Sequence, residues 1–404
     1  MRSRWDGGGL ALAATLAILP GCGREERGSG AVLARGAPGT VCLQGDCRDD
    51  FSMLARIGGE IYAGEFRHGV PHGTGGLDFP GGQSYFGAFV DGRMEGVGRF
   101  RWPEAVYEGP FVAGLPDGQG TLEMSDGTRY TGGWKAGLKQ GEGYEIDYLG
   151  AVYSGGWRDG AREGRGRETS ADGSMFVGTW RNGKRSGPGV ADGPGGYRFE
   201  GEFVDGVESG PGKATFADGR SYEGGFRNGK PDGQGTLRFA DGRVYGGGLV
   251  DGRMSGKGRV TLPGGTVVDG EYHEGALEGM GKRTSPDGSV FEGQYSRGLP
   301  SGPGTLRYAD GRVLRAEYRA GRLHGQAILE KPDGSAEVQS YHNGKLLRSI
   351  PKDRYDEAEK RRQERLEKQR AAAPAPAAQP APAAQPDAPP QAQPGRKFEV
   401  DLGR

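Results

Sequence analysis

The sequence predicts an all-β protein, an elongated and twisted array of β-hairpin repeats that is followed by a short charged helix and a disordered tail. Three observations lead to this prediction. Glycine accounts for 82 of the 404 residues, about three times the usual 7%. Only 34% of the chain is hydrophobic, which is too little for one large core. The pattern aromatic-x-Gly-x-aromatic also recurs through the middle of the chain, and recurrence at a fixed period indicates a repeat architecture.

The repeat has a period of 23 residues, with one interval of 22 between Tyr85 and Tyr107. A half unit, Glu337–Lys345, follows in the same register, so the predicted array covers residues 58–345, about 12.5 units. The twelve full units begin at Tyr62, Tyr85, Tyr107, Tyr130, Tyr153, Phe176, Phe199, Tyr222, Tyr245, Val268, Phe291 and Leu314.

Each unit is expected to form two short antiparallel strands. In the eighth unit, "YEGGFRNGKPDGQGTLRFADG", Tyr222, Gly224 and Phe226 share one face because side chains alternate along a strand. Asn-Gly and Asp-Gly are strong hairpin signals, since primed turns require positive φ. Gly229 and Gly242 are therefore expected to close the turns, and each unit is expected to continue the sheet of the one before it.

Further glycines are expected to make room for the large rings on the inner face, where a side chain would compete with an aromatic ring for space. Charged residues occupy the outward positions, which keeps the opposite face soluble. The glycines assigned to this role in the eighth unit are Gly224, Gly233 and Gly235, and the rings are Tyr222, Phe226 and Phe239.

The unit resembles the MORN repeat, whose hallmark is Y-x-G-x-[FWY]-x-x-G-x-x-x-G-x-G, and the resemblance covers Tyr62 to Gly334. This resemblance implies an elongated, twisted, all-β array. The twelfth unit departs from the pattern at Leu314, Ala316 and Ala327, which we interpret as a cap because terminal repeats are often atypical. Val268, at the first aromatic position of the tenth unit, is expected to be a local weak spot.

Residues 1–21 have the features of a signal peptide. Arg2 and Arg4 precede the apolar stretch Leu10–Leu19, which is too short to span a bilayer. The following "LPGC" resembles a bacterial lipobox, which implies cleavage before Cys22 and lipid attachment to it. Because Gly23 is not aspartate, the resemblance implies an outer-membrane lipoprotein that faces the periplasm. The alternatives are ordinary secretion or display at the cell surface.

Residues 22–57 are interpreted as a linker that contains the other two cysteines. Cys42 and Cys47 flank four residues, and in an oxidising compartment we expect them to form a small-loop disulfide. The alternative is a free or reactive pair.

Three segments follow the array. Residues 346–370 are predicted to contain a charged, solvated helix, supported by pairs such as Glu357–Arg361. Residues 371–395 form an Ala/Pro/Gln-rich spacer that is not expected to pack. In the C-terminal peptide 396–404, Phe398, Val400 and Leu402 alternate with polar or charged residues, so this peptide could add a strand to a partner or to the array, or fray.

No catalytic, cofactor or metal site is predicted, and the chain is therefore not expected to be an enzyme. The G-x-G elements recur in every unit, and Gly-Lys is never followed by the Ser or Thr of a phosphate-binding loop. His68 and His72 flank the first turn, but two ligands make a poor metal site. The 53 basic residues balance 53 acidic ones, so the whole-chain charge gives no reason to expect nucleic acid as a partner.

Two functions remain from the sequence. The first is a non-enzymatic scaffold that binds proteins of the cell envelope. The alternative is direct binding of lipid headgroups or cell-wall glycan by the repeat surface. Trp134, Trp157 and Trp180 occupy one position in three successive units, where they could form a ladder for sugar rings or the thickest part of the core.

Overall fold

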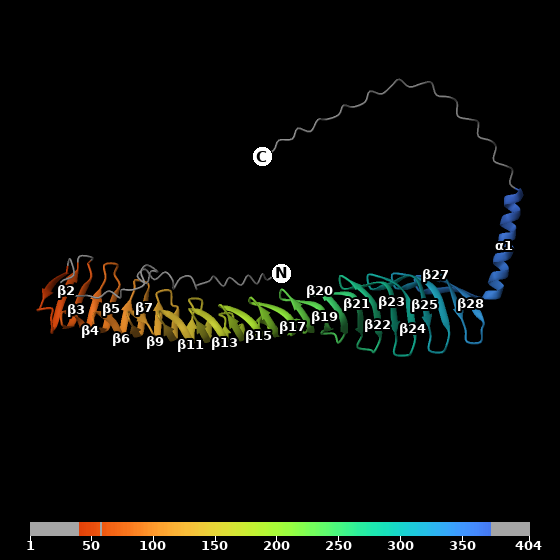
Figure 1. Ribbon diagram of the computed structural model, residues 1–404. Helices are drawn as coiled ribbons and strands as arrows, with labels where there is room; N and C mark the ends of the chain where they lie inside the picture. Colours follow the sequence, from red (N-terminus) through yellow and green to blue (C-terminus); the bar gives the residue numbers. More distant parts are fainter. Residues whose placement is uncertain (1–39, 57–58, 373–404) are drawn as a thin grey trace, which may run out of the picture.

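The structure is a computed structural model that describes residues 40–56 and 59–372. These residues form one open antiparallel sheet of 29 strands with a single α-helix at its C-terminal end (Figure 1). The hairpins follow one another along the long axis of a rod, and strands that are adjacent in sequence are paired in the sheet. The predicted all-β hairpin array is confirmed.

Most units consist of a seven-residue strand followed by a nine-residue strand. The strands are β1 (Thr40–Gln44), β2 (Phe51–Arg56), β3 (Ile61–Arg67), β4 (Val70–Asp78), β5 (Ser84–Val90), β6 (Arg93–Arg101), β7 (Ala105–Val112), β8 (Leu115–Pro116), β9 (Gly118–Met124), β10 (Arg129–Lys135), β11 (Leu138–Ile146), β12 (Val152–Arg158), β13 (Ala161–Thr169), β14 (Met175–Arg181), β15 (Lys184–Asp192), β16 (Arg198–Val204), β17 (Val207–Thr215), β18 (Ser221–Arg227), β19 (Lys230–Arg238), β20 (Val244–Val250), β21 (Arg253–Thr261), β22 (Val267–His273), β23 (Ala276–Thr284), β24 (Val290–Ser296), β25 (Leu299–Arg307), β26 (Val313–Arg319), β27 (Arg322–Glu330), β28 (Ala336–His342) and β29 (Lys345–Pro351). A short 3-10 turn, η3 (Pro194–Gly196), precedes β16, and the helix α1 (Lys352–Ala372) follows β29.

The turns have the geometry that the sequence predicts. In the eighth unit Asn228 and Gly229 both have positive φ, +51° and +75°, as a type I′ hairpin requires. The N–H of Gly229 then donates to the carbonyl of Glu208 in the preceding unit at 3.0 Å. Each such turn therefore closes its own hairpin and also bonds to the previous one.

A bulge bends most of the hairpins in the array, and in most of these it lies beside the inner glycines. In the eighth unit Gly224 pairs with Gly235 and Phe226 pairs with Pro231, so three residues of β19 lie opposite Gly225 alone. A side chain at Gly235 would lie 2.5 Å from Cε2 of Tyr222, and one at Gly224 would meet the same ring. These two glycines thus make room for a ring, as predicted.

The role predicted for Gly233 was wrong. Its φ is +105°, and a side chain there would approach only the Cα of Gly225, at 3.9 Å. This glycine is needed because of its backbone conformation in the bulge. It does not make room for an aromatic ring.

The core is a chain of aromatic rings along the rod. The first ring of a unit packs edge-to-face against the second ring of its own unit and against that of the next unit. Tyr130, for example, lies 5.3 Å from Trp134 and 5.2 Å from Trp157 between ring centroids. This geometry is favourable beyond the area that it buries. The contacts join hairpins that bury too little surface to be stable alone.

The tenth unit has no aromatic ring at its first position, and its inner face is packed differently. Val268 is too small to cover the glycine pair Gly270–Gly281, and Leu277 extends into that space together with the ring of Tyr295 from the next unit. Leu277 is 3% exposed and stands opposite Tyr272, where the eighth unit has Pro231. The expected weak spot is therefore filled from the neighbouring strand.

We predict that Val268→Tyr alone destabilises the protein by about 1–3 kcal/mol, because the new ring and Leu277 would compete for one space. The double variant Val268→Tyr with Leu277→Pro restores the arrangement of the eighth unit and is expected to recover most of that loss. Hydrogen exchange of the amides of β22 and β23 measures both effects. Equal protection in the single and double variants would contradict the proposed compensation.

Both ends of the array differ from the prediction. Part of the predicted linker 22–57 forms the hairpin β1–β2, which pairs with β3 and extends the sheet. At the other end β29 continues to Pro351, beyond the predicted boundary at residue 345, and α1 begins only at Lys352. The sheet also continues past the twelfth unit, so the replacements in that unit do not cap it. Leu314, Ala316 and Ala327 instead form a small buried cluster with Leu329.

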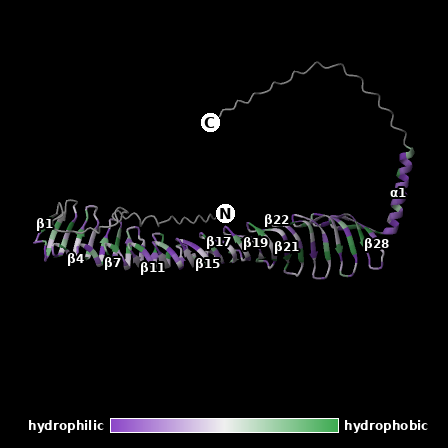
Figure 2. Cartoon of the chain, viewed as in Figure 1, coloured by the Kyte–Doolittle hydropathy of each residue, from purple (hydrophilic) through white to green (hydrophobic). Residues whose placement is uncertain are grey.

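The helix α1 lies at the end of the sheet. Gln326 donates from Nε2 to the hydroxyl of Tyr355 at 2.9 Å, and none of the α1 residues is buried. Figure 2 shows that α1 is hydrophilic along most of its length. No helix in the described ranges is both long and apolar enough to cross a membrane. The predicted signal peptide, Cys22, the spacer beyond Ala372, and Phe398, Val400 and Leu402 lie outside the described residues.

Candidate functional site

The inner face changes chemistry in the middle of the rod. In units such as the eighth, two inner positions of the second strand carry apolar residues, Pro231 and Leu237. In the fourth and fifth units charged residues stand at both positions, and in the sixth unit Arg185 stands at the first and Ala191 at the second. We call this set the charged seam, and it consists of Lys139, Glu145, Arg162, Glu168 and Arg185.

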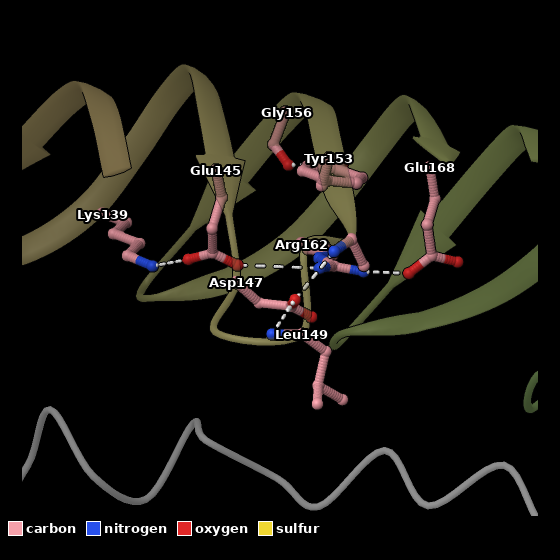
Figure 3. A network of polar contacts seen from close by, with 9 residues as sticks. Lys139, Glu145, Asp147, Leu149, Tyr153, Gly156, Arg162 and Glu168 are labelled. Carbon is pink, nitrogen blue, oxygen red and sulfur yellow. Dashed lines mark hydrogen bonds and ion pairs between the residues drawn. The ribbon is translucent and has the colours of Figure 1, made fainter. Parts of the chain in front are cut away.

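The members of the charged seam form one continuous network, and Figure 3 shows the part of it from Lys139 to Glu168. Lys139 pairs with Glu145 on β11, and Glu145 reaches Arg162 of the next unit, with 3.6 Å between Oε1 and Nη2. Glu168 is held by two arginines, with Nη1 of Arg162 and Nη2 of Arg185 each 2.6 Å away. The side chains are only 10–24% exposed. Charge therefore alternates along the rod, and each carboxylate bridges two cations.

Aromatic rings enclose the cations of the seam. The Nζ atom of Lys139 lies 4.6 Å from the ring centroid of Tyr130 and 4.5 Å from that of Trp157. Arg162 lies in the same way against Tyr153 and Trp180, at 4.4 and 5.1 Å. Desolvated cation–π contacts of this kind are worth about 2 kcal/mol. They connect the seam to the aromatic core of adjacent units.

Burial and pairing act in opposite directions on the seam. Burial lowers the pKa of Lys139, and the charge of Glu145 opposes that shift. For Glu168, burial alone would raise the pKa, but the hydrogen bonds and charges of Arg185 and Arg162 together hold it below its usual range. The seam neutralises itself through its own pairs. Its chemistry suits cohesion between repeats better than proton transfer to a substrate.

One acidic group next to the seam behaves differently. Burial raises the pKa of Glu208, and the hydroxyl of Tyr197 donates a 2.8 Å hydrogen bond to its Oε1 that opposes the shift. Glu208 follows Arg185 at the same inner position of the next unit, opposite Phe203. The alternation of charge along the inner face therefore continues for one more repeat.

The three tryptophans belong to the core. Trp134, Trp157 and Trp180 are 5%, 6% and 4% exposed, and each packs edge-to-face between two first-position rings. Rings buried to this extent have no free face for a sugar. The prediction of a ligand-contacting ladder is corrected accordingly, and the alternative reading of these residues as part of the core is the one that the packing supports.

The other residues singled out from the sequence lie at the N-terminal end. A disulfide joins Cys42 on β1 to Cys47 in the turn between β1 and β2, with the two Cα atoms 6.1 Å apart. His68 lies beside Asp49 and His72 beside Asp91, at 3.9 and 3.6 Å. Within the described residues, no group of three or more potential metal ligands comes together.

The buried tyrosines make a testable prediction about pH. Burial raises the pKa of Tyr85, Tyr107 and Tyr272 to about 12, with a smaller contribution from neighbouring charges. The ordinary pKa of a tyrosine is 10.0, so between pH 10 and about 12 the unfolded chain releases these protons and the folded chain keeps them. The contribution of these tyrosines to the free energy of unfolding is therefore fully present below pH 10 and is lost as the pH rises to about 12.

An alkaline titration checks this prediction. Tyrosinate absorbance reports the ionisation of the tyrosines as the pH of the native protein is raised. The buried ones should ionise only together with the loss of the β-sheet circular dichroism signal. Simultaneous ionisation of all tyrosines in a protein that stays folded would contradict the burial of the aromatic rings in the core.

The charged seam was missed by reasoning from the consensus unit. Its signal is present in the sequence. Lys139, Arg162 and Arg185 occupy a position of the unit at which four other units have proline, namely Pro71, Pro116, Pro231 and Pro300. A lysine or arginine between glycines looks like a solvated residue until the units are compared position by position. The register in the sheet then shows that these side chains point inward.

The fold and these repeated positions define the class of the protein: a single-sheet, tandem β-hairpin repeat protein. A family model described as the MORN repeat matches twelve segments of the chain, and the chain belongs to the MORN repeat family. The matched residues are 62–84, 85–104, 107–129, 130–147, 153–175, 176–196, 199–219, 222–242, 245–267, 269–290, 291–311 and 315–336. The repeats support a repeat-based protein-interaction or membrane-associated scaffold.

Solved structures add only distant similarities. The chain is 18% identical to the SAS-4 (dCPAP) TCP domain of Drosophila melanogaster, solved with a proline-rich motif of Ana2 (dSTIL). That match covers 44% of this chain and 90% of the other, with a TM-score of 0.25. A streptogramin B lyase structure is 11% identical over 74% of this chain and 93% of its own, with a TM-score of 0.12. TM-scores this low carry no argument about function.

Proposed function

We propose that this chain is a non-enzymatic scaffold of the bacterial cell envelope, anchored to the outer membrane by a lipid on Cys22 and facing the periplasm. The observation that supports it most is the division of the rod into two faces. The inner face holds the repeats together through its aromatic rings and the paired charges of the seam. The outer face presents charged and apolar side chains to solvent in repeated rows.

Such a surface suits binding to other proteins. It is long, it is made of regular strands, and its side chains change from unit to unit while the backbone stays constant. Extended surfaces of this kind serve as partner-binding platforms in other repeat proteins. Opposite charges are interspersed on this face, as in the pair Arg259–Asp269, which does not favour strong attraction to anionic lipid headgroups.

The proposal is tested by crosslinking and pull-down of the full chain from a bacterial envelope, with and without residues 396–404. The scaffold predicts that defined envelope proteins co-purify with the full chain. If the C-terminal peptide contributes a contact, at least one of them is lost when it is removed. Recovery of no envelope protein with either chain would contradict the proposal.

The anchor is tested separately. Cys22→Ser should abolish membrane association, and globomycin should block processing of the wild-type chain. The alternative function, direct binding of lipid headgroups or glycan, predicts that the array pellets with liposomes or peptidoglycan. Pelleting of the purified array without any protein partner would favour this alternative over the scaffold.

A further inference from the structure

Parts of the outer face are neutralised locally. At three places on its middle row, two residues that face each other on adjacent strands carry opposite charges and form an ion pair. The pairs Arg99–Glu108, Arg259–Asp269 and Lys282–Glu292 have N–O distances of 3.1, 2.6 and 3.6 Å. Cross-strand pairs of this kind stabilise the sheet that carries them.

The strands β13 to β16 depart from this pattern. Arginines occupy β13, glutamates occupy β16, and the two strands between them carry apolar residues. Along one row the register is Arg167, Val177, Val190 and Glu200, each residue facing the next across the sheet. The name outer patch is used below for six residues, which are Arg165, Arg167, Val177, Val190, Glu200 and Glu202.

The charges of the outer patch are open to a partner. Within the described residues, none of its arginines or glutamates forms a hydrogen bond or an ion pair, and three of the four are exposed. Glu200 faces Lys213 on β17, but these two do not pair within 4.0 Å. Val177 is 45% exposed. A shallow groove of about 850 Å³ is lined by all six residues and extends to Glu142 on the arginine side and to Pro211 on the glutamate side.

Along the rod, the charge of the outer patch has opposite signs on the two sides of its middle. Positive charge lies on one side, negative charge on the other, and valine in between, over three strand spacings or about 14 Å. A surface of this kind is complementary to itself when one copy is turned end for end. A two-fold axis parallel to the strands, between β14 and β15, places arginines against glutamates and valines against valines.

We propose that the outer patch binds a second copy of this chain, and that the two rods pack antiparallel through their outer faces. The interface is isologous, which is the commonest arrangement of soluble dimers. A parallel arrangement is disfavoured because it would place Arg165 and Arg167 against the same residues of the partner. The proposal concerns self-association and does not depend on the identity of any envelope partner.

The neighbouring strands fit the same two-fold axis. It pairs β12 with β17 and β11 with β18 of the second copy, so that Ser154 faces Lys213 and Tyr144 faces Glu223. One row of the patch contains Arg167 and Glu200, and the other contains Arg165 and Glu202. Across strands β11 to β18, no residue of either row faces a like charge of the second copy. The nearest like charges are Arg181 and Lys184 at the turn end, at the rim, where Lys184 pairs with Asp205 at 3.5 Å.

The outer face of these eight strands is also large enough for a stable dimer interface. Eight strands at about 4.8 Å spacing and seven residues at about 3.3 Å each give a patch of roughly 38 by 23 Å. This is on the order of 900 Å² on each copy, compared with about 800 Å² per partner in a standard-size interface.

The test uses charge reversal and sedimentation velocity of the full chain carrying Cys22→Ser. The wild-type pair should sediment as a dimer. Arg165→Glu with Arg167→Glu should weaken the dimer on the order of 100-fold or more, because glutamates would then face glutamates. Glu200→Arg with Glu202→Arg should weaken it similarly. Mixing the two variants should restore a heterodimer, since each reversed side then meets its complement.

Controls keep the test decisive. Arg307→Glu with Arg319→Glu reverses two exposed arginines outside the eight strands and should leave the dimer intact. The fourfold variant, with both sides reversed in one chain, should dimerise again, which shows that the reversed chains remain folded. A monomeric wild-type chain, reversal variants that still dimerise, or a mixture that stays monomeric would each overturn the proposal.

Discussion

Gly235→Ala is expected to lower the free energy of local unfolding by about 2–3 kcal/mol, one of the largest effects of any single methyl group in this chain. The added carbon would stand 2.5 Å from Cε2 of Tyr222, a ring that is 1% exposed and therefore has little room to move. A long repeat array does not unfold in one step. Hydrogen exchange of the amides in β18 to β20 is therefore the appropriate measurement.

Gly246→Ala is the matched control. Gly246 lies on the adjacent strand β20 and points to the outer face, where a side chain would find no atom within 4 Å. Its substitution is expected to change the same protection by about 0.5 kcal/mol or less. Equal losses in the two variants would mean that glycine is required for backbone freedom throughout, and not for the space under the ring.

Glu168→Gln is the second prediction with a large expected effect. The substitution keeps the shape of the side chain but removes the charge that two half-buried arginines share at 2.6 Å. Breaking a buried ion pair by neutralising one member costs about 3–5 kcal/mol, because the remaining charge is left without compensation. Since Arg162 keeps Glu145 at 3.6 Å, we expect a loss of about 2–3 kcal/mol, measured by hydrogen exchange in β13 to β15.

Two comparisons separate the seam from ordinary surface charge. Glu292→Gln removes an exposed pair with Lys282 and is expected to cost at most about 0.5 kcal/mol. Glu168→Leu with Arg185→Leu removes both members of the last pair of the seam and leaves Arg162 with Glu145, so it should cost less than Glu168→Gln alone. A seam variant that behaves like the surface control would show that these charges are solvated in the folded protein.

The sequence was sufficient to predict what every unit shares. Hairpin turns at Asn-Gly, the inward Tyr222 and the space left by Gly224 and Gly235 follow from strand alternation and turn chemistry, and the structure bears them out. Repetition makes such reasoning strong, because an error at one unit would conflict with eleven others. The same consensus explains the edge-to-face contacts between successive rings only in part, since these depend on how adjacent hairpins pair.

Features that depend on pairing between strands could not be predicted. Gly233 was misassigned because the bulge shifts the register between Gly224 and Phe226, and alternation alone does not reveal a bulge. The hairpin β1–β2 was missed because its strands lack the repeat pattern and are recognised only by their pairing with β3. The charged seam and the outer patch appear only when residues from different units are placed side by side.

The two sets of charges have different consequences for the rod. The seam lies inward, its members neutralise one another, and its removal is expected to loosen the contact between units. The outer patch lies on the opposite face, in the fifth to seventh units, and its charges are separated by about 14 Å of apolar surface. Variation at inner positions therefore affects cohesion, whereas variation at outer positions creates surfaces for association.

In the function that we propose, this MORN rod is a scaffold whose outer face binds proteins. Site-specific photo-crosslinking in bacteria tests it most directly, with a photoreactive residue placed in turn at the exposed outer positions Phe86, Glu223 and Glu292 of the full chain. The account predicts protein adducts at one or more of these positions, identifiable by mass spectrometry and absent at the exposed turn position Gly206. Adducts only to lipid or glycan, or no adduct at any outer position, would contradict it.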